Sequence, residues 1–316
     1  MVQSEAYEET RKSMLSIIIP VYNENENVVS ISKVIDKMLS DKGLDYEIIF
    51  VDDGSTDSSW QIISSISEQD GKIKGLSFSR NFGKESAIYA GLKESVGDCA
   101  VVLDCDLQHP PEYILEMYEL WESGYEIVEG IKKSRGCEGV LHRVLTKCFY
   151  ACISGACGKR MDNTSDYKLL DRKAINAILD IQEQASFFRA LTMWIGFKTT
   201  RIYYDVRERT NGKSKWSKLK LIRYAVSNIT SFTSIPLHVI TFLGVTTVVL
   251  GTVLSIITIY RYLIHESVEG FSTVIIMQCY SSGVIMVGIG IVGYYLSRIF
   301  DEIRKRPRYI ISKKTY

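Results

Sequence analysis

Short apolar runs alternate with helix-period segments through the first third of the chain. Four runs rich in Ile, Val and Leu predict buried strands, at Leu15–Val21, Tyr46–Val51, Ile73–Phe78 and Ala100–Leu103. Between them, apolar side chains recur at the spacing of an amphipathic helix, in residues 26–39, 58–68 and 84–96. Strands and helices that alternate in this way form mostly parallel sheets covered on both faces, so we expect an α/β domain.

Polar clusters stand where each predicted strand ends. They are Tyr22-Asn23-Glu24, Asp52-Asp53, Ser79-Arg80-Asn81 and Asp104-Cys105-Asp106. Any one of them has the composition of an ordinary turn. Because parallel sheets bind ligands beyond the carboxyl ends of their strands, four such clusters in sequence predict one shared site.

Two carboxylates one residue apart follow the fourth predicted strand. In an extended segment Asp104 and Asp106 face the same way, and close carboxylates repel unless a cation lies between them. Oxygen ligands of this kind suit Mg²⁺ or Mn²⁺, with Gln108 and His109 available to add a ligand or orient a water. A paired acid and base, as in glycoside hydrolysis, remains open because sequence spacing does not give the carboxylate separation. The chain has no GxxxxGK[ST] or GxGxxG loop, which argues against a P-loop NTPase and a dinucleotide oxidoreductase.

The second half of the chain is patterned for a different solvent. The stretches 236–260 and 271–297 contain no Asp, Glu, Lys or Arg, and each is long enough as a helix to cross a hydrocarbon core of about 30 Å. We expect a membrane hairpin. Lysine and arginine are concentrated in 213–223 and 298–314, whereas the connecting loop has little net charge, so both chain ends are expected in the cytoplasm. The acidic residues near the start argue against a signal peptide.

Charge and cysteine content narrow the function classes. Lys and Arg number 38 against 37 Asp and Glu, so the chain lacks the overall basic field of a nucleic-acid-binding protein. Its 7 cysteines include no CxxC pair and indicate a reducing compartment. Residues 213–235 combine lysines with an apolar side, which predicts a helix lying at the membrane surface.

Three motifs in order carry a resemblance to a known family. The stretches IIIPVYNE, VDDGSTD and VLDCDLQHPPE resemble the inverting family 2 glycosyltransferases with the GT-A fold. Later stretches are similar to the polyprenyl-phosphate members, such as bactoprenol glucosyltransferases and dolichol-phosphate mannose synthase: RNFGKE at 80–85, TSDYKL at 164–169, Arg209 with GKSKW at 212–216, and YYLSRIFDEIRKRPRYI. Two departures stand out. Lys132-Lys133 replaces an arginine that is frequent in the subgroup, and the QxxRW motif of processive synthases is absent.

The resemblance assigns roles to individual residues. It implies that nucleotide contacts fall on Pro20, Tyr22, Glu24, Asp53 and Asp104, with Asp53 accepting a hydrogen bond from the base. A divalent ion is expected on Asp104 and Asp106, with Gln108 as a further ligand. Asp166 matches a catalytic position, and we expect it to orient the donor sugar or a cation rather than abstract a proton, completing a catalytic set with Asp104 and Asp106. Two anionic substrates also require cations, and the candidate phosphate-binding residues are Arg80, Lys84, Arg135, Arg209, Lys213, Ser214 and Lys215.

Together these inferences define an expected organisation and function. We expect an N-terminal extension (1–13), a cytoplasmic GT-A catalytic domain (14–212), a basic juxtamembrane helix (213–235), a transmembrane hairpin (236–297) and a basic cytoplasmic tail (298–316). The expected reaction is metal-dependent, inverting transfer of one sugar from UDP-glucose or UDP-N-acetylglucosamine to undecaprenyl phosphate at the inner membrane, by a homo-oligomer. Alternatives are a GDP-mannose-dependent enzyme, a transferase that builds a polysaccharide or modifies a lipid, and an inactive sugar-nucleotide-binding scaffold.

Overall fold

The computed structural model describes residues 13–133, 164–181, 187–205, 235–264 and 270–316. The chain divides into two compact units, one made of Met1–Ser217 together with Pro307–Tyr316, and the other of Lys218–Arg306. We call the first the catalytic unit and the second the hairpin unit, and describe each separately.

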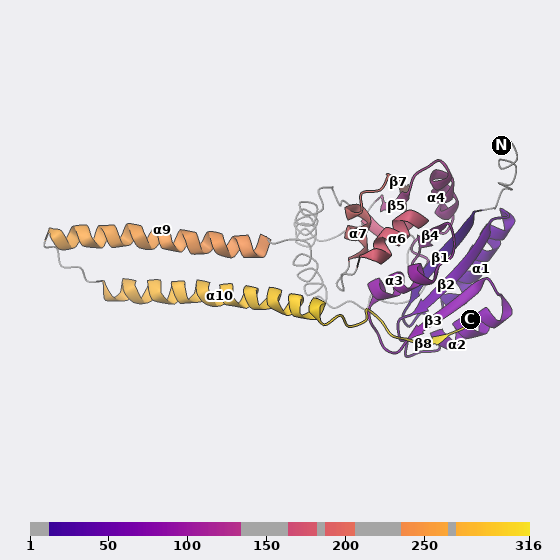
Figure 1. Ribbon diagram of the computed structural model, residues 1–316, viewed down its shortest axis with the longest axis horizontal. Coiled ribbons are helices and arrows are strands. Elements are labelled where there is room, and N and C mark those ends of the chain that lie inside the picture. Colours follow the sequence, from indigo (N-terminus) through magenta and orange to yellow (C-terminus); the bar gives the residue numbers. More distant parts are fainter. Residues whose placement is uncertain (1–12, 134–163, 182–186, 206–234, 265–269) are drawn as a thin grey trace, which may run out of the picture. The chain divides into compact units, whose positions relative to one another are not determined.

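An eight-stranded sheet forms the centre of the catalytic unit (Figure 1). Its strands are β1 (Met14–Val21), β2 (Asp45–Asp52), β3 (Ile73–Phe78), β4 (Cys99–Val102), β5 (Ile127–Lys132), β6 (Thr164–Asp171), β7 (Thr199–Tyr204) and β8 (Ile311–Lys314). They lie in the order β7-β5-β6-β4-β1-β2-β3-β8, and only β6 and β8 run against their neighbours. The mostly parallel α/β sheet and its first four strands are confirmed, with strand ends shifted by one residue at most.

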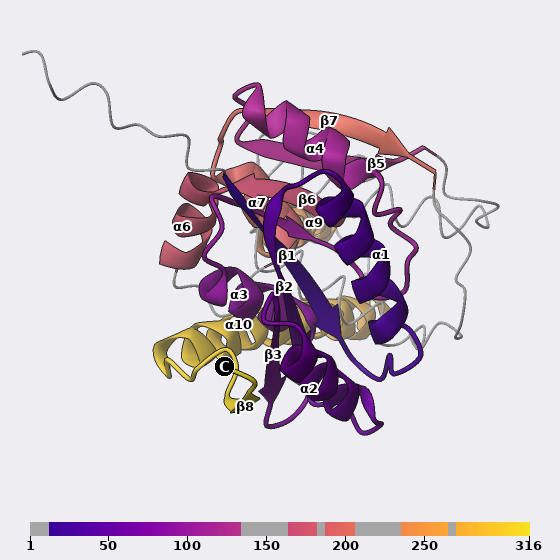
Figure 2. The same ribbon diagram turned by 90° about the vertical axis from the view of Figure 1, so that its right-hand side faces the viewer.

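Helices cover both faces of this sheet (Figure 2). One face packs on α1 (Val28–Asp41), α2 (Ser59–Gln69) and α4 (Tyr113–Glu122). The other packs on α3 (Lys84–Glu94), α6 (Arg172–Asp180) and α7 (Phe188–Trp194). Side chains alternate between the two cores along each strand, so that Ile17 and Ile19 enter the first core and Ile18 enters the second. Burial on both faces explains why the strands are continuous apolar runs rather than alternating ones.

The strand register brings the predicted polar clusters to one edge. Val21 pairs with Asp52, and Asp52 pairs with Ser77, so β1, β2 and β3 end side by side. On the other side of β1, Ile18 pairs with Val102 and accepts a hydrogen bond from the backbone N–H of Leu103 at 2.9 Å. Asp104 therefore leaves the sheet at the same edge as the β1–β3 clusters, as the sequence predicts.

The hairpin unit contains two long apolar helices, α9 (Ile235–Leu263) and α10 (Phe271–Ile303), which lie side by side (Figure 1). Leu237–Arg261 and Tyr280–Ile303 are long and apolar enough to cross a membrane, and almost none of either segment is buried. Small residues let membrane helices approach closely, and six glycines lie along α9 and α10. A Cβ at Gly288 would lie 3.3 Å from Ile240 Cγ2, whereas five others would meet nothing within 4 Å: Gly244, Gly251, Gly283, Gly290 and Gly293.

Residues after the hairpin return to the sheet, which we did not predict. The stretch 298–316 was expected to be a tail outside the catalytic domain. Instead α10 continues to Ile303, and β8 pairs antiparallel with β3. An uncovered edge strand exposes unpaired N–H and C=O groups, and β8 satisfies those of β3. Its sequence, ISKK, is too short and polar to show a strand pattern.

Side chains on both sides of β8 secure it. The Tyr309 ring stacks on Phe78 with centroids 4.9 Å apart, and the Arg308 guanidinium donates to the carbonyl of Ile181 at 2.7 Å. At the far end, the Thr315 hydroxyl accepts from the Gly75 N–H at 2.9 Å and is hydrogen-bonded to the Ser67 hydroxyl at 2.7 Å. The segment 307–316 is thus part of the folded catalytic unit.

Replacing Tyr309 should weaken the catalytic unit. Tyr309→Ala removes the stacked ring and is expected to lower the free energy of unfolding by about 2–3 kcal/mol. The neighbouring Ile310 is 51% exposed, and Ile310→Ala should change it by less than about 0.5 kcal/mol. Denaturant unfolding of the purified full-length protein measures both values. Equal effects of the two substitutions would show that the segment is not packed as described.

Candidate active site

The loops after β1 and β2 are locked together by hydrogen bonds. The backbone N–H of Asn23 donates to Ser55 Oγ at 2.9 Å, and Asn23 Oδ1 accepts from the Thr56 N–H at 2.8 Å. Gly54 has φ +67°, and a Cβ at this position would lie 2.5 Å from the backbone carbon of Arg80. Only glycine fits this close approach, which is why the β2 loop packs directly on the loop after β3.

Asp53 fixes the start of α3. Its two carboxylate oxygens accept from the backbone N–H groups of Phe82 at 2.6 Å and Gly83 at 2.9 Å, immediately before Lys84. Burial raises the pKa of Asp53 to about 6, against the lowering effect of these two donors. The predicted contact of Asp53 with a nucleotide base stays a prediction. What the structure adds is an anchoring role: Asp53 holds the turn that delivers Lys84.

Four charged side chains meet at this edge, and we call them the ion cluster: Lys84, Asp104, Asp166 and Arg189. Lys84 Nζ lies 2.6 Å from Asp104 Oδ1 and 2.7 Å from Asp166 Oδ2. Arg189 binds Asp166 with two donors, Nε to Oδ1 at 2.6 Å and Nη2 to Oδ2 at 2.9 Å. The cluster joins the start of α3, the loop after β4, strand β6 and helix α7.

The ion cluster keeps both carboxylates ionised. Burial alone would raise the pKa of Asp166, but Arg189 and Lys84 outweigh it and hold the pKa well below the usual range. Burial opposes ionisation of Asp104 as well, and Lys84 lowers its pKa. Asp166, 4% exposed and bound by two cations, is therefore a poor proton acceptor. Its expected role in catalysis stays a prediction.

The charges of the ion cluster also act on Lys132, which ends β5. Burial and the nearby Arg189 guanidinium lower its pKa, with Asp104 acting in the opposite direction. Cations crowded in this way favour an anion among them. Lys132 is half-buried, and the lysine pair that departs from the subgroup pattern thus places one charge close to the ion cluster.

His109 is buried next to Asp104 and contacts its backbone. It is 3% exposed, and its ring stacks on Tyr167 with centroids 5.1 Å apart. Burial lowers the pKa of His109 to about 4, so the ring is neutral at pH 7. Its Nδ1 accepts a weak hydrogen bond from the Asp104 backbone N–H at 3.4 Å. His109 therefore orients the start of the loop rather than supplying charge.

The carboxylates after β4 fit a divalent ion that is completed by a substrate. Among the described residues, no group of three or more His, Cys, Asp or Glu side chains could enclose a metal. Asp104 and Asp106 are both half-buried, and the Gln108 backbone N–H donates to Asp106 Oδ1 at 3.2 Å. Mg²⁺ characteristically binds to one or two carboxylates and substrate phosphates rather than to an all-protein cage. This donor set suits such an ion only together with a diphosphate.

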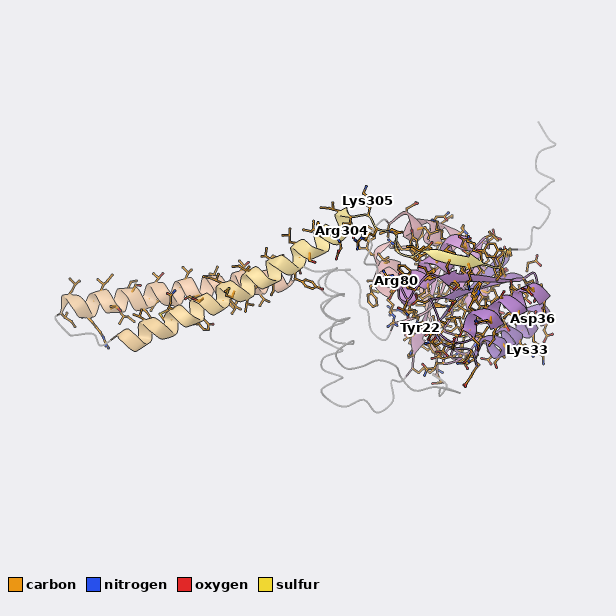
Figure 3. The ribbon with its side chains drawn as sticks, turned by 90° about the horizontal axis from the view of Figure 1, so that it is seen from below. Tyr22, Lys33, Asp36, Arg80, Arg304 and Lys305 are labelled. Atoms are coloured by element: carbon orange, nitrogen blue, oxygen red, sulfur yellow. The ribbon has the colours of Figure 1, made fainter. Side chains whose placement is uncertain are left out.

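Some of the other expected site residues are described by the structure, and the rest lie outside the described residues. Tyr22 and Arg80 lie on the same side of the catalytic unit, away from Lys33 and Asp36 on α1 (Figure 3). Tyr22 is 39% exposed, and the exposed Arg80 guanidinium lies 4.4 Å from the centre of the Phe82 ring. Pro20 is the second-last residue of β1 and pairs with Val51, and Glu24 accepts from the Asn27 side chain at 2.7 Å. Outside the described residues lie Arg135, Arg209, Lys213, Ser214 and Lys215.

Arg189 is the site residue that the sequence reasoning missed. It is the one charged residue in the apolar stretch FFRALTMW, at 187–194. A lone charge within an apolar helix needs a buried partner, and that signal could have identified it. Which carboxylate it would meet depends on how α7 packs on β6, which the pattern does not give.

Comparisons with known proteins agree with this geometry. Residues 16–179 match the family model described as glycosyl transferase family 2. The putative glycosyltransferase CsbB of Bacillus subtilis is 36% identical over 96% of this chain and 92% of its own. The chain belongs to glycosyl transferase family 2. It is thus a glycosyltransferase, and the scaffold alternative falls away.

Further matches extend over both units. A prophage bactoprenol glucosyl transferase homolog of Escherichia coli is 32% identical over 95% of this chain and 98% of its own. A crystal structure of glucosyl-3-phosphoglycerate synthase from Mycobacterium tuberculosis, with Mn²⁺, UDP-glucose and phosphoglyceric acid, matches 70% of this chain and 80% of its own. Its TM-score is 0.50 at 19% identity, which is a likeness of fold. The expected GT-A fold is confirmed.

The ion cluster predicts a large effect at Asp166. Asp166→Asn leaves Lys84 and Arg189 without their common anion, and we expect turnover to fall by about 100-fold or more because both cations lose their position. Because Asp166 is already ionised, the pH dependence of kcat/KM should show the same ionisations in the wild type and in Asp166→Asn. Asp205, which pairs with Lys133 on the surface at 76% exposure, supplies the matched control Asp205→Asn, with unchanged turnover. Near-wild-type turnover of Asp166→Asn would remove this residue from the mechanism.

Proposed function

We propose that this glycosyltransferase moves one sugar from a nucleotide-sugar to a polyprenyl phosphate, with inversion and with a divalent cation. One observation carries the proposal. In the catalytic unit, Lys84 and Arg189 bind the carboxylates of the ion cluster, and the charges of the cluster also act on Lys132. The same chain continues into two helices that are long enough to cross a membrane. A site that must hold a diphosphate and a second phosphate needs cationic groups held in place, and Lys84, Arg189 and Lys132 are such groups.

The chemistry follows from the acceptor. A lipid monophosphate is largely dianionic at neutral pH, so its oxygen can attack the anomeric carbon without first losing a proton. The new C1–O–phosphate bond forms as the bond from C1 to the nucleoside diphosphate breaks, and the nucleoside diphosphate leaves. This route needs no strong base, which accords with the low pKa of Asp166. The geometry thus favours a phosphate acceptor over a hydroxyl acceptor.

Asp104 and Asp106 are the residues that would hold the divalent ion, Mg²⁺ or Mn²⁺. When bound, it would neutralise charge on the leaving diphosphate. On this proposal Lys84 serves the donor phosphates beside Asp104, and Arg189 faces the acceptor phosphate beside Asp166. Nucleotide contacts are proposed for Pro20, Tyr22, Glu24, Asp53 and Asp104, which lie at or just after the carboxyl ends of β1, β2 and β4. Gln108 is proposed as a further ligand of the ion. Phosphate binding is proposed for Arg80, Arg135, Arg209, Lys213, Ser214 and Lys215.

The membrane assignment also belongs to the proposal. The exposed apolar faces of α9 and α10 would be covered by lipid, with both chain ends in the cytoplasm. The relatives named bactoprenol glucosyl transferase support a bactoprenol acceptor and a glucosyl donor, and we propose undecaprenyl phosphate and UDP-glucose for these roles. UDP-N-acetylglucosamine is the second donor candidate, and GDP-mannose the alternative. A homo-oligomer remains expected.

Transfer to a lipid tests the proposal directly. Purified protein with Mn²⁺ and undecaprenyl phosphate should label a mild-acid-labile lipid from UDP-glucose or UDP-N-acetylglucosamine, and far less from GDP-mannose. Undecaprenol, which lacks the phosphate, is the matched acceptor control and should remain unlabelled, because its hydroxyl would need a base. Labelling of undecaprenol at an equal rate, or labelling from none of the three donors, would overturn the proposal.

A further inference from the structure

A second group of charged side chains lies next to the ion cluster and begins at Lys168, two residues after Asp166 on β6. Lys168 is fully buried, and its Nζ donates to Glu129 Oε1 at 2.7 Å and to Thr192 Oγ1 at 2.6 Å. Glu129 is 2% exposed and pairs with Lys168 in register across β5 and β6. Burial lowers the pKa of Lys168, against the opposing effect of Glu129. A buried ion pair contributes little to stability compared with apolar residues, so its presence beside the site calls for another explanation.

The geometry connects this pair to Arg189. Asp166 and Lys168 are two residues apart on a strand and so project from the same face, toward α7. Arg189 and Thr192 are three residues apart on α7 and so lie on one side of the helix. The strand therefore holds the helix at two points: Asp166 binds Arg189, and Lys168 binds Thr192.

The second point reaches Arg189 through the helix backbone. The Thr192 hydroxyl that accepts from Lys168 also donates to the carbonyl oxygen of Arg189 at 3.0 Å. A continuous path of hydrogen bonds thus runs from Glu129 through Lys168 and Thr192 to the backbone of Arg189. Helix α7 has only 7 residues, too few to be stable by itself, so such anchors determine where it lies.

We infer that Lys168, Glu129 and Thr192 form a positioning device that sets α7 so that the Arg189 guanidinium meets Asp166 with both of its donors. Lys168 is a positioning residue: its hydrogen bonds go to Glu129 and Thr192, and it acts on α7 through Thr192. Arg201 extends the path to the surface, with Nε 3.4 Å from Glu129 Oε2, which compensates the second oxygen of that carboxylate. The inference rests on the proposed function for the acceptor used in the assay and for the placement of Arg189 at that acceptor.

Thr192→Val tests the device, with Thr192→Ser as the matched control. Valine keeps the shape of threonine but removes the hydroxyl, and serine keeps the hydroxyl. Thr192→Val should raise the KM for undecaprenyl phosphate about 10-fold and leave the KM for the sugar nucleotide within twofold, because Arg189 alone is displaced. Thr192→Ser should behave as wild type. Equal changes in both KM values, or none, would overturn the inference.

A double-substitution cycle shows whether the effect passes through Arg189. Arg189→Lys removes the two-donor contact, and adding Thr192→Val to it should then cost less than twofold, since there is no guanidinium left to position. A full 10-fold loss in the Arg189→Lys background would mean that Thr192 acts elsewhere. If Thr192→Val lowers the yield of folded protein, Lys168→Met combined with Glu129→Leu removes both buried charges and must give the same selective rise in KM.

Hydrogen exchange gives a readout that does not depend on the acceptor. In Thr192→Val the backbone amides of residues 188–194 should exchange about 10-fold faster than in wild type, whereas those of α6 should not change. If wild type transfers no sugar but α7 loosens as described, the proposed function fails and the positioning device stands. If wild type is active and exchange in α7 is unchanged, the device fails and the proposed function stands.

Discussion

The arrangement of the site depends on the placement of one ammonium group between two carboxylates. Lys84 Nζ contacts Asp104 and Asp166, which come from different strands on the same edge of the sheet. Without a cation between them, two buried carboxylates would repel and resist joint ionisation. Two features of the neighbouring loops hold Lys84 in this position. Asp53 binds the turn before it, and Gly54 lets that turn lie against the neighbouring loop.

Under the proposed function, the same interaction would allow one site to serve two anions. With Asp104 and Asp166 kept ionised, the carboxylates provide fixed negative points, and the cations around them provide fixed positive ones. A donor diphosphate with its metal can share Asp104, while an acceptor phosphate can share Arg189. Cationic groups held in place before the reaction cost no rearrangement when charge moves from the acceptor to the leaving group. In our account the buried Lys168–Glu129 pair extends this fixed array by holding α7.

Sequence patterns were sufficient for features whose physical cause is local. The first four strands and the two membrane-length helices follow from runs of apolar residues. The polar clusters at Asp52-Asp53 and Asp104-Cys105-Asp106 follow from their places at the ends of strands. The misses depend on long-range packing. Arg189 meets Asp166 only because α7 lies on β6, and β8 exists only because the edge of β3 is open. Lys168 could not be recognised as buried, since a lysine in a strand normally faces solvent.

The prediction for the basic residues 298–316 also missed contacts that depend on long-range packing. The basic residues after α10 suggested a solvated tail, yet Lys314 Nζ pairs with Glu94 Oε1 at 2.8 Å and Arg308 caps the carbonyl of Ile181. The segment Pro307–Tyr316 follows the hairpin in the chain, yet it belongs to the catalytic unit and adds β8 to its sheet. Truncation after α10 would therefore remove a strand of the catalytic sheet.

The central claim is that the carboxylates after β4 hold the donor through a shared metal, and binding of UDP tests it most directly. Calorimetric titration of UDP into the full-length protein, with and without Mn²⁺, should show at least about 10-fold tighter binding with the metal. In Asp106→Ala the metal should make no difference, and binding should match the metal-free wild type. Equal UDP affinity with and without Mn²⁺ in the wild type, or a metal effect that survives in Asp106→Ala, would contradict the account.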